Sequence, residues 1–354
     1  KLKLQVKADL LQLNDGGGKY KDWVLIKEKQ QKLNTQVGSW ISRRLGMPWT
    51  PRFRYVNVII NGDYRGLYLL CESVEAKSGR VETEADGYLF ERDPYWMNEA
   101  VYFESSMGMQ YTFKYPDEED ITSEQIEYIK GCVNDLEQAV TLGTYDNYID
   151  VESFALWLLA HDILGTWDSD GSNIFLVKAN SKQESKITMG PLWDYDTIEW
   201  RKGLWARIRE DRFFYIPYML ESSERLINAY IEKWNNIYPT LFNEIVDDLD
   251  DYAMSDVALA LNAARMLDHQ RWPGEIAYRS VEENVAEHKT WFAERLPWMI
   301  SRMQAFPTCI RNIENEGHNK DAPTFDISGH RVHETARGII IRNGKKILRP
   351  STAK

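Results

Sequence analysis

The sequence predicts an α+β fold of two lobes, a sheet-rich small lobe followed by a helical large lobe. Over the first 115 residues, short segments alternate apolar and polar side chains, a pattern with period two that is typical of strands. From about Leu204 to Phe306, nearly every segment instead has helical periodicity. We therefore assign residues 1–118 to the small lobe and residues 119–306 to the large lobe, which together form one domain, 1–306.

The small lobe is predicted to be mostly sheet with one helix. Lysine and aliphatic residues alternate over residues 1–8, which predicts a strand, and the pattern from Gln30 to Leu45 is helical. Gly46 follows as a suitable helix C-cap. The pair Asn61-Gly62 predicts a tight hairpin turn between two strands. Four later strands of this lobe are expected at Phe53–Ile60, Leu67–Glu72, Gly87–Glu91 and Tyr111–Tyr115.

The large lobe begins after a hinge near Pro116–Thr122, where the alternation ends. A first helix is predicted from Ser123 to Ala139, and a second from Val151 to Leu164 with Asp150 as its N-cap. Two short strands are expected next, at Asn173–Lys178 and Lys186–Met189.

The C-terminal tail, residues 307–354, differs from both lobes. Its first part is polar, and short strands are expected at Phe325–Val332 and Gly338–Leu348 with a hairpin turn at Asn343-Gly344. Strands this few and short are not stable alone, so we expect the tail to dock on the main domain or to serve as a sorting signal.

Composition excludes several classes of protein. The 354 residues carry a net charge of −11, which disfavours nucleic acid as a partner because binding it needs a basic face. Three widely spaced cysteines, Cys71, Cys132 and Cys309, form neither a disulfide framework nor a zinc cluster, and we expect Cys71 and Cys132 to be buried free thiols. No apolar run reaches the roughly 18 residues of a membrane span.

The stretch from Gly165 to Asn173 is the strongest candidate for chemistry. It is a polar segment between a predicted helix and a predicted strand, and Asp168 and Asn173 stand five positions apart in it. Protein kinases use this spacing for a catalytic aspartate and a metal-binding asparagine. A second aspartate, Asp194, follows the next strand, where kinases place another metal ligand. Mg²⁺ favours one or two carboxylates with phosphate oxygens and water.

Simpler interpretations of the same residues remain open. Asp and Asn are common turn residues, so Asp168–Gly171 is also consistent with a tight turn and Asp194 with a helix cap. An EF-hand would need glycine at the sixth position, whereas Gly171 is at the fourth position when Asp168 is the first. His161, on the preceding helix, is either a general base or a core histidine.

Several stretches of the sequence resemble the CotH family, the spore-coat-protein-H-like atypical protein kinases. They include the Leu45–Pro48 segment, the Val58–Glu72 hairpin, Lys114–Asp117, the segment from Asp168 to Asn173, and Met189–Asp196, which contains Trp-Asp-Tyr-Asp. Order and spacing match from about Lys7 to Trp200, and the helical stretch to about Phe306 follows more loosely.

The resemblance implies a kinase-like fold, ATP with Mg²⁺ or Mn²⁺, and phosphoryl transfer to a hydroxyl of a protein substrate. Asp168 is then the catalytic aspartate. The implied metal ligands are Asn173, Asp194 and Asp196, and the residues implied near the nucleotide are Lys7, with Lys3 as the alternative, and Glu72. Family members usually open the first helix with Arg-Asn; here Leu33-Asn34 stands there beside Lys32. A family member that binds without catalysing is the alternative.

The tail resembles the C-terminal module of proteins exported by Bacteroidetes, through Phe325–Arg331 and Gly338–Lys346. This resemblance implies a secreted or cell-surface protein whose signal peptide has been removed. Two other functions remain to be compared with kinase activity: surface adhesion or scaffolding, and glycan binding or hydrolysis. The thirteen tryptophans suit sugar stacking, but many lie in helical stretches, where core packing is the simpler role.

Overall fold

The structure, a computed structural model, describes most of the main domain and four short strands of the tail. The described residues are 2–13, 18–167, 171–199, 215–304, 324–326, 331–332, 338–342 and 345–349. The chain divides into two compact units, Lys1–Leu296 and Pro297–Lys354, and the division falls within the helix α7 (Val281–Gln304). Among the described helices, none has the length and apolar character that a membrane crossing requires.

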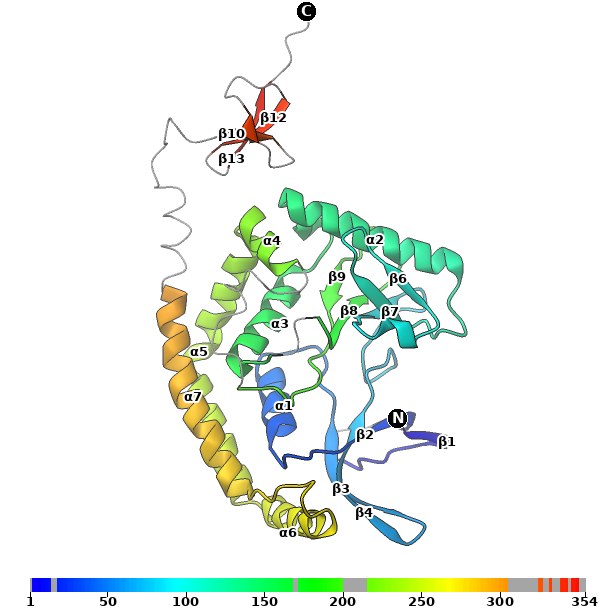
Figure 1. The fold of residues 1–354 in the computed structure, drawn as a ribbon, viewed down its shortest axis with the longest axis vertical. Helices are drawn as coiled ribbons and strands as arrows, with labels where there is room; N and C mark the ends of the chain where they lie inside the picture. Colours follow the sequence, from blue (N-terminus) through cyan, green and yellow to red (C-terminus); the bar gives the residue numbers. More distant parts are fainter. Residues whose placement is uncertain are drawn as a thin grey trace, which may run out of the picture. The chain divides into compact units, whose positions relative to one another are not determined.

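The mixed α+β fold predicted from the sequence is confirmed, and its first sheet is built from the N-terminal 72 residues (Figure 1). Four antiparallel strands lie in the order β1-β2-β4-β3. Their bounds are β1 Leu2–Ala8, β2 Tyr20–Ile26, β3 Phe53–Ile60 and β4 Asp63–Glu72, and the helix α1, Asn34–Arg44, lies between β2 and β3 in the chain.

The hairpin turn between β3 and β4 forms where the sequence predicts it. Asn61 and Gly62 have φ values of 52° and 82°, the left-handed conformation that a two-residue hairpin of this kind requires and that Asn-Gly adopts most readily. The hairpin thus fixes β3 as the edge strand beside β4.

The second sheet combines strands from before and after two helices. Its five strands lie in the order β6-β7-β5-β8-β9. Their bounds are β5 Tyr88–Arg92, β6 Tyr102–Glu104, β7 Gln110–Tyr115, β8 Ile174–Lys178 and β9 Ile187–Met189. Strands that the sequence analysis placed in the small lobe therefore pair with strands placed in the large lobe, because β5 lies between β7 and β8.

Helices cover this sheet and form the rest of the main domain. The helix α2, Ser123–Leu142, begins at a capping box formed by Thr122 and Gln125, and α3, Val151–Leu164, begins at Asp150, whose side chain accepts from the amide of Ser153. α3 is almost wholly buried. The later helices are α4 Ile216–Ser222, α5 Arg225–Ala253, α6 Asp256–Arg271 and α7; short 3-10 turns lie at Trp96–Asn98 and Tyr145–Asn147.

The described part of the tail is a four-stranded sheet of its own. Its order is β11-β10-β12-β13, with β10 Thr324–Asp326, β11 Arg331–Val332, β12 Gly338–Arg342 and β13 Lys345–Arg349. The expected turn residues Asn343-Gly344 lie outside the described residues, but the strands on either side pair through Arg342 and Lys345.

The cysteines and tryptophans show whether the side chains expected in the core are buried there. Cys71 and Cys132 are both free; Cys71 is buried as expected, whereas Cys132 is only partly buried, and Cys309 lies outside the described residues. Trp157 and Trp234 are fully buried in α3 and α5, which fits the core-packing role rather than sugar stacking.

Candidate functional site

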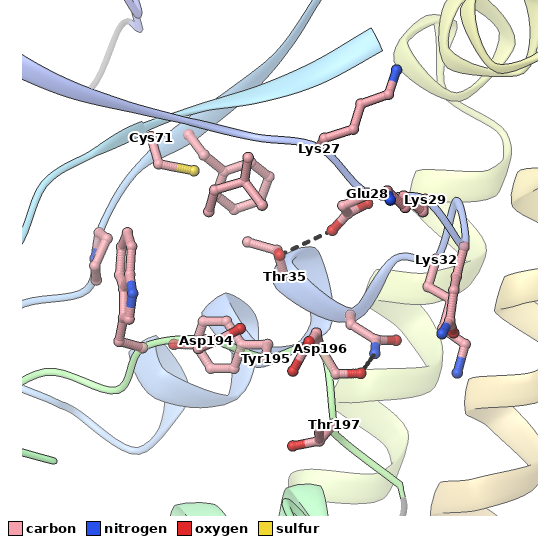
Figure 2. A pocket seen from close by; sticks show the side chains of 16 residues that line it. Lys27, Glu28, Lys29, Lys32, Thr35, Cys71, Asp194, Tyr195, Asp196 and Thr197 are labelled. Carbon is pink, nitrogen blue, oxygen red and sulfur yellow. Dashed lines mark hydrogen bonds between the residues drawn. The ribbon is translucent and has the colours of Figure 1, made fainter. Parts of the chain in front are cut away.

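A cavity of about 460 Å³ lies in the main domain between the loop that joins β2 to α1 and the segment that follows β9 (Figure 2). Side chains of opposite charge line it. The residues that contribute are Ile26, Lys27, Glu28, Lys29, Gln30, Lys32, Asn34, Thr35, Pro51, Phe53, Cys71, Trp193, Asp194, Tyr195, Asp196 and Thr197. Phe53, Trp193 and Cys71 give it an apolar and aromatic side that suits a flat ring system.

One wall of the cavity is acidic and consists of the Trp193–Thr197 segment, which carries Asp194 and Asp196. Asp194 has a φ of 59°, a left-handed conformation that Asp and Asn tolerate better than other non-glycine residues. α1 holds this segment at two points. The Asn34 Nδ2 donates to the carbonyl of Asp196 at 3.0 Å, and the hydroxyls of Ser42 and Tyr195 lie 2.9 Å apart.

A glycine in α1 allows the close approach of this acidic wall. A Cβ at Gly38 would overlap the ring of Tyr195, and real Cβ atoms do not come this close to a ring. The ring therefore packs directly on the backbone of α1, which fixes the neighbouring Asp194 and Asp196 relative to the helix.

The opposite wall is the loop that joins β2 to α1, and it carries three lysines (Figure 2). The Lys27 ammonium is already engaged, because its Nζ lies 2.5 Å from Asp268 Oδ1 and donates to the carbonyl of Leu67. Lys29 and Lys32 have no ion pair with any residue that the structure describes. Their charge is therefore available to an anionic ligand.

Glu28 lies between these lysines, and the pKa of its carboxyl is raised toward neutral pH. Burial of the carboxyl raises the pKa of Glu28 from its ordinary value of 4.5 to about 7, against the lowering effects of the Arg265 charge and of a hydrogen bond from Thr35. The nearby Asp196 adds a smaller rise to the pKa. Thr35 Oγ1 donates to Glu28 Oε1 at 3.1 Å, and Oε2 is buried without a partner among the described residues. A protonated acid is the form that this surrounding favours.

Arg265 of α6 holds the lysine-bearing loop in place, and its side chain has no exposed surface. Its Nη2 donates to the carbonyl of Lys32 at 3.0 Å, and its own carbonyl accepts from Gln31 Nε2 at 2.9 Å. Gln31 has a φ of 47°, in the left-handed region that a glutamine seldom occupies. These contacts hold the loop in a conformation that its local sequence does not favour.

The predicted metal ligands are only partly brought together. Asp194 and Asp196 line the cavity, whereas Asn173 does not. Asn173 immediately precedes β8, has a φ of 58°, and donates from Nδ2 to Ser172 Oγ at 3.3 Å. Asp168, the predicted catalytic residue, and its neighbours up to 170 lie outside the described residues, as does most of the calcium-binding loop considered above.

The residues expected near the nucleotide are placed elsewhere. Lys3 and Lys7 are exposed on β1 and do not line the cavity. Glu72, expected either near the nucleotide or as a surface charge, is completely buried and accepts from Arg52, with Arg52 Nη2 2.6 Å from Glu72 Oε1. Glu72 is thus the anionic half of an internal ion pair.

His161 has the surroundings of a core histidine. It is 2% exposed, its ring lies 3.9 Å from that of Trp157, and its Nδ1 is 2.7 Å from the hydroxyl of Thr166. A histidine enclosed in this way lacks the access to substrate that a general base needs.

The donor atoms at the cavity suit a hard divalent cation that keeps part of its shell for other ligands. In the described residues, no three His, Cys, Asp or Glu side chains come together as a metal-binding group. The two carboxylates of Asp194 and Asp196 match the small protein share that Mg²⁺ takes when phosphate oxygens and water supply the rest.

Neither Lys29 nor Lys32 was assigned a role in the site from the sequence. Lys29 and Lys32 belong to the run Lys27-Glu28-Lys29-Gln30-Gln31-Lys32, which directly precedes a predicted helix. Lysines placed just before a helix N-terminus lie close to its unpaired backbone N–H groups, where anions are stabilised. This position is the signal that identifies them.

Comparisons with known proteins give a family and remote structural likenesses. A family model described as CotH kinase protein matches residues 32–299. None of the curated proteins matches the sequence. A chain in the HipA–HipB toxin–antitoxin complex with operator DNA from Shewanella oneidensis MR-1 is similar at 13% identity and a TM-score of 0.32. The alignment covers 84% of this chain and 65% of that one, and so low a TM-score supports no argument about function.

Proposed function

The chain belongs to the CotH kinase protein family, whose model matches residues 32–299, and we propose that it is an atypical kinase that transfers the γ-phosphoryl group of ATP to a hydroxyl of a protein. The cavity between the β2–α1 loop and the Trp193–Thr197 segment is the proposed nucleotide site. The alternative is a catalytically degenerate adhesion or scaffold protein of kinase-like shape. Such a protein is expected to show no binding of ATP.

The observation that carries the proposal is the pairing of two unlike walls across one cavity. Asp194 and Asp196 stand on one wall, and Lys29 and Lys32, which form no ion pair with a described residue, stand on the other. A triphosphate bound with a divalent cation needs both, because carboxylates hold the cation while ammonium groups neutralise the phosphates. The aromatic side formed by Phe53 and Trp193 suits the base.

Each residue has a proposed role in phosphoryl transfer. Asp168 accepts the proton of the attacking hydroxyl, and Asn173, Asp194 and Asp196 supply oxygen atoms for Mg²⁺ or Mn²⁺. The metal, when bound, neutralises charge on the phosphate oxygens. We assign the phosphate contacts to Lys32 and Lys29 in preference to Lys7 or Lys3, since only the former pair lines the cavity.

The test is calorimetric titration of ATP, with and without Mg²⁺, on the natural sequence and on Asp194→Ala. We expect binding that requires Mg²⁺ and that the substitution removes, while the far-UV circular dichroism is unchanged. Asp247→Ala, which changes an exposed aspartate of α5, is the matched control and is expected to bind as the natural sequence does. The absence of heat in every combination would favour the scaffold function.

We also propose that the protein acts outside the cytoplasm and that residues 307–354 are its sorting module. The basis is the resemblance of the tail to export modules together with its separation from the main domain as a compact unit. Expression of the full-length gene with and without the tail codons in a Bacteroidetes host, followed by fractionation, tests it. Retention of the shortened protein inside the cell supports the proposal, and unchanged export contradicts it.

A further inference from the structure

A groove of about 520 Å³ runs along the free edge of β3, next to the candidate nucleotide site. Phe53, Arg54 and Tyr55 are consecutive in β3, and all three line it. Neighbouring residues of a strand point to opposite faces of the sheet. The groove therefore reaches side chains on both faces of β3, and it also touches Leu67 of the neighbouring strand β4.

Apolar side chains from outside β3 also line the groove. They include Leu13, which lies between β1 and β2 in the chain, and Val257, Ala260 and Leu261 of α6. Val257 has 58% of its surface exposed, and Ala260 is also exposed. An apolar surface of this kind beside a strand edge offers places for side chains of an added strand.

The backbone of this edge is unpaired within the part of the chain that the structure describes. The amide of Glu72 donates to the carbonyl of Arg52, so alternation along the antiparallel ladder turns the N–H and C=O groups of Phe53, Tyr55 and Asn57 away from β4. No described residue bonds these groups. Free backbone groups with this spacing specify one kind of partner, an extended polypeptide.

The groove borders the nucleotide site, because Phe53 lines both cavities. A strand added along β3 would therefore lead from Asn57 past Phe53 toward Trp193 and Asp194. From this geometry we infer that the β3 edge binds the segment of the protein substrate next to the phosphorylated residue, as an added β-strand with small or aliphatic side chains at alternate positions. The inference rests on the proposed kinase function for the identity of the occupant.

The test uses a positional-scanning library of synthetic peptides, each with one serine and one fixed neighbour among degenerate positions. We expect phosphorylation to select aliphatic or small residues at every second position on one side of the serine, since only alternate side chains of an added strand face α6. The pool with the best residues is then labelled with fluorescein, and its binding without ATP is measured by fluorescence anisotropy.

Two variants of α6 localise the effect. Ala260→Trp fills the groove and is expected to raise the KM for the selected pool by about tenfold or more, as loss of a docking contact does, while the KM for ATP is unchanged. Ala263→Trp, an exposed position of the same helix that does not line the groove, is the matched control and is expected to leave both constants unchanged. Circular dichroism of both variants establishes that they fold.

The possible outcomes distinguish failure of the proposed peptide binding at the groove from failure of the proposed kinase function. Phosphorylation without periodic selection, or selection that Ala260→Trp does not reduce, overturns the inference while the kinase function stands. If no peptide is phosphorylated, a library member that binds the natural protein and not Ala260→Trp supports the groove alone, and no binding overturns it. A dimer that Ala260→Trp dissociates identifies a second copy as the occupant and also overturns the inference.

Discussion

The two walls of the cavity achieve their positions in different ways. The acidic wall, Trp193–Thr197, follows directly from a short strand and rests on α1 through Asn34, Ser42 and Gly38. The lysine-bearing wall has no regular structure and is held by α6, through the guanidinium and the carbonyl of Arg265 and through the ion pair of Lys27 with Asp268. The acidic wall is therefore determined mostly by its neighbours in the large lobe and α1, whereas the lysine wall depends on a contact more than 230 residues away in the chain.

The largest effect expected is at the acidic wall. Asp194→Asn keeps the size of the side chain and removes its charge, so we expect Mg²⁺-dependent ATP affinity to fall by about 100-fold, as loss of a metal-binding carboxylate does in phosphoryl transfer. Equilibrium titration with a fluorescent ATP analogue measures it. An affinity that is unchanged by this substitution would show that the carboxylates play no part in nucleotide binding.

The next largest effect concerns stability at the lysine wall. The pKa of Glu28 is raised to about 7 in the folded protein, so the native state holds this proton more tightly than the unfolded chain. Its stabilising effect is greatest below pH 4.5 and is lost as pH rises toward 7. Glu28→Gln, which is neutral at every pH, should therefore be about 3 kcal/mol more stable than the natural protein at pH 8.

Urea denaturation at a series of pH values measures this difference. The two proteins should converge toward pH 4.5, and the exposed Glu232→Gln change in α5 should follow the natural protein throughout. A Glu28→Gln variant that is less stable at pH 8 would mean that the ionised carboxylate is the form that the loop requires.

A smaller effect distinguishes the lysines of the cavity from those of β1. Changing Lys29 and Lys32 together to alanine should weaken ATP binding by about tenfold, because two ammonium groups that contact phosphate are lost. The matched pair of changes, Lys3→Ala with Lys7→Ala, should leave the affinity unaltered. The reverse result would restore the phosphate role to β1.

The smallest effect concerns the contact that joins the two walls. Asn34→Ala removes the hydrogen bond to the carbonyl of Asp196 and should lower the free energy of unfolding by about 1 kcal/mol, with a few-fold loss in ATP affinity. Asn228→Ala at an exposed position of α5 is the control. If stability falls and affinity does not, α1 supports the fold without positioning Asp196.

The sequence indicates those parts of the molecule that depend on neighbouring residues. The Asn61-Gly62 turn and the Asp150 cap follow from local backbone chemistry, and both are found where the sequence predicts them. The association of β5 with β8 depends on residues about 85 positions apart, and no local pattern encodes such a pairing. The strands expected in one lobe are for this reason divided between two sheets.

The same limit applies to the candidate site. Asp194 and Asp196 were found because a short motif carries them, whereas Lys29 and Lys32 lie in a loop without periodicity. Glu72 was implied near the nucleotide by the family resemblance, and its observed partner is Arg52, 20 residues earlier in the chain. The role of an isolated charged residue depends on its partner, which only the folded chain specifies.

Phe53 is the one ring that borders both the candidate nucleotide site and the β3 groove. Any ligand that changes the rotamer or mobility of this ring therefore alters the free energy of binding at the other cavity. Thermodynamic linkage requires the effect to be mutual, so that nucleotide and peptide would change each other's dissociation constants by the same factor. A single aromatic side chain would then couple the two ligands, so that binding of either one changes the affinity for the other.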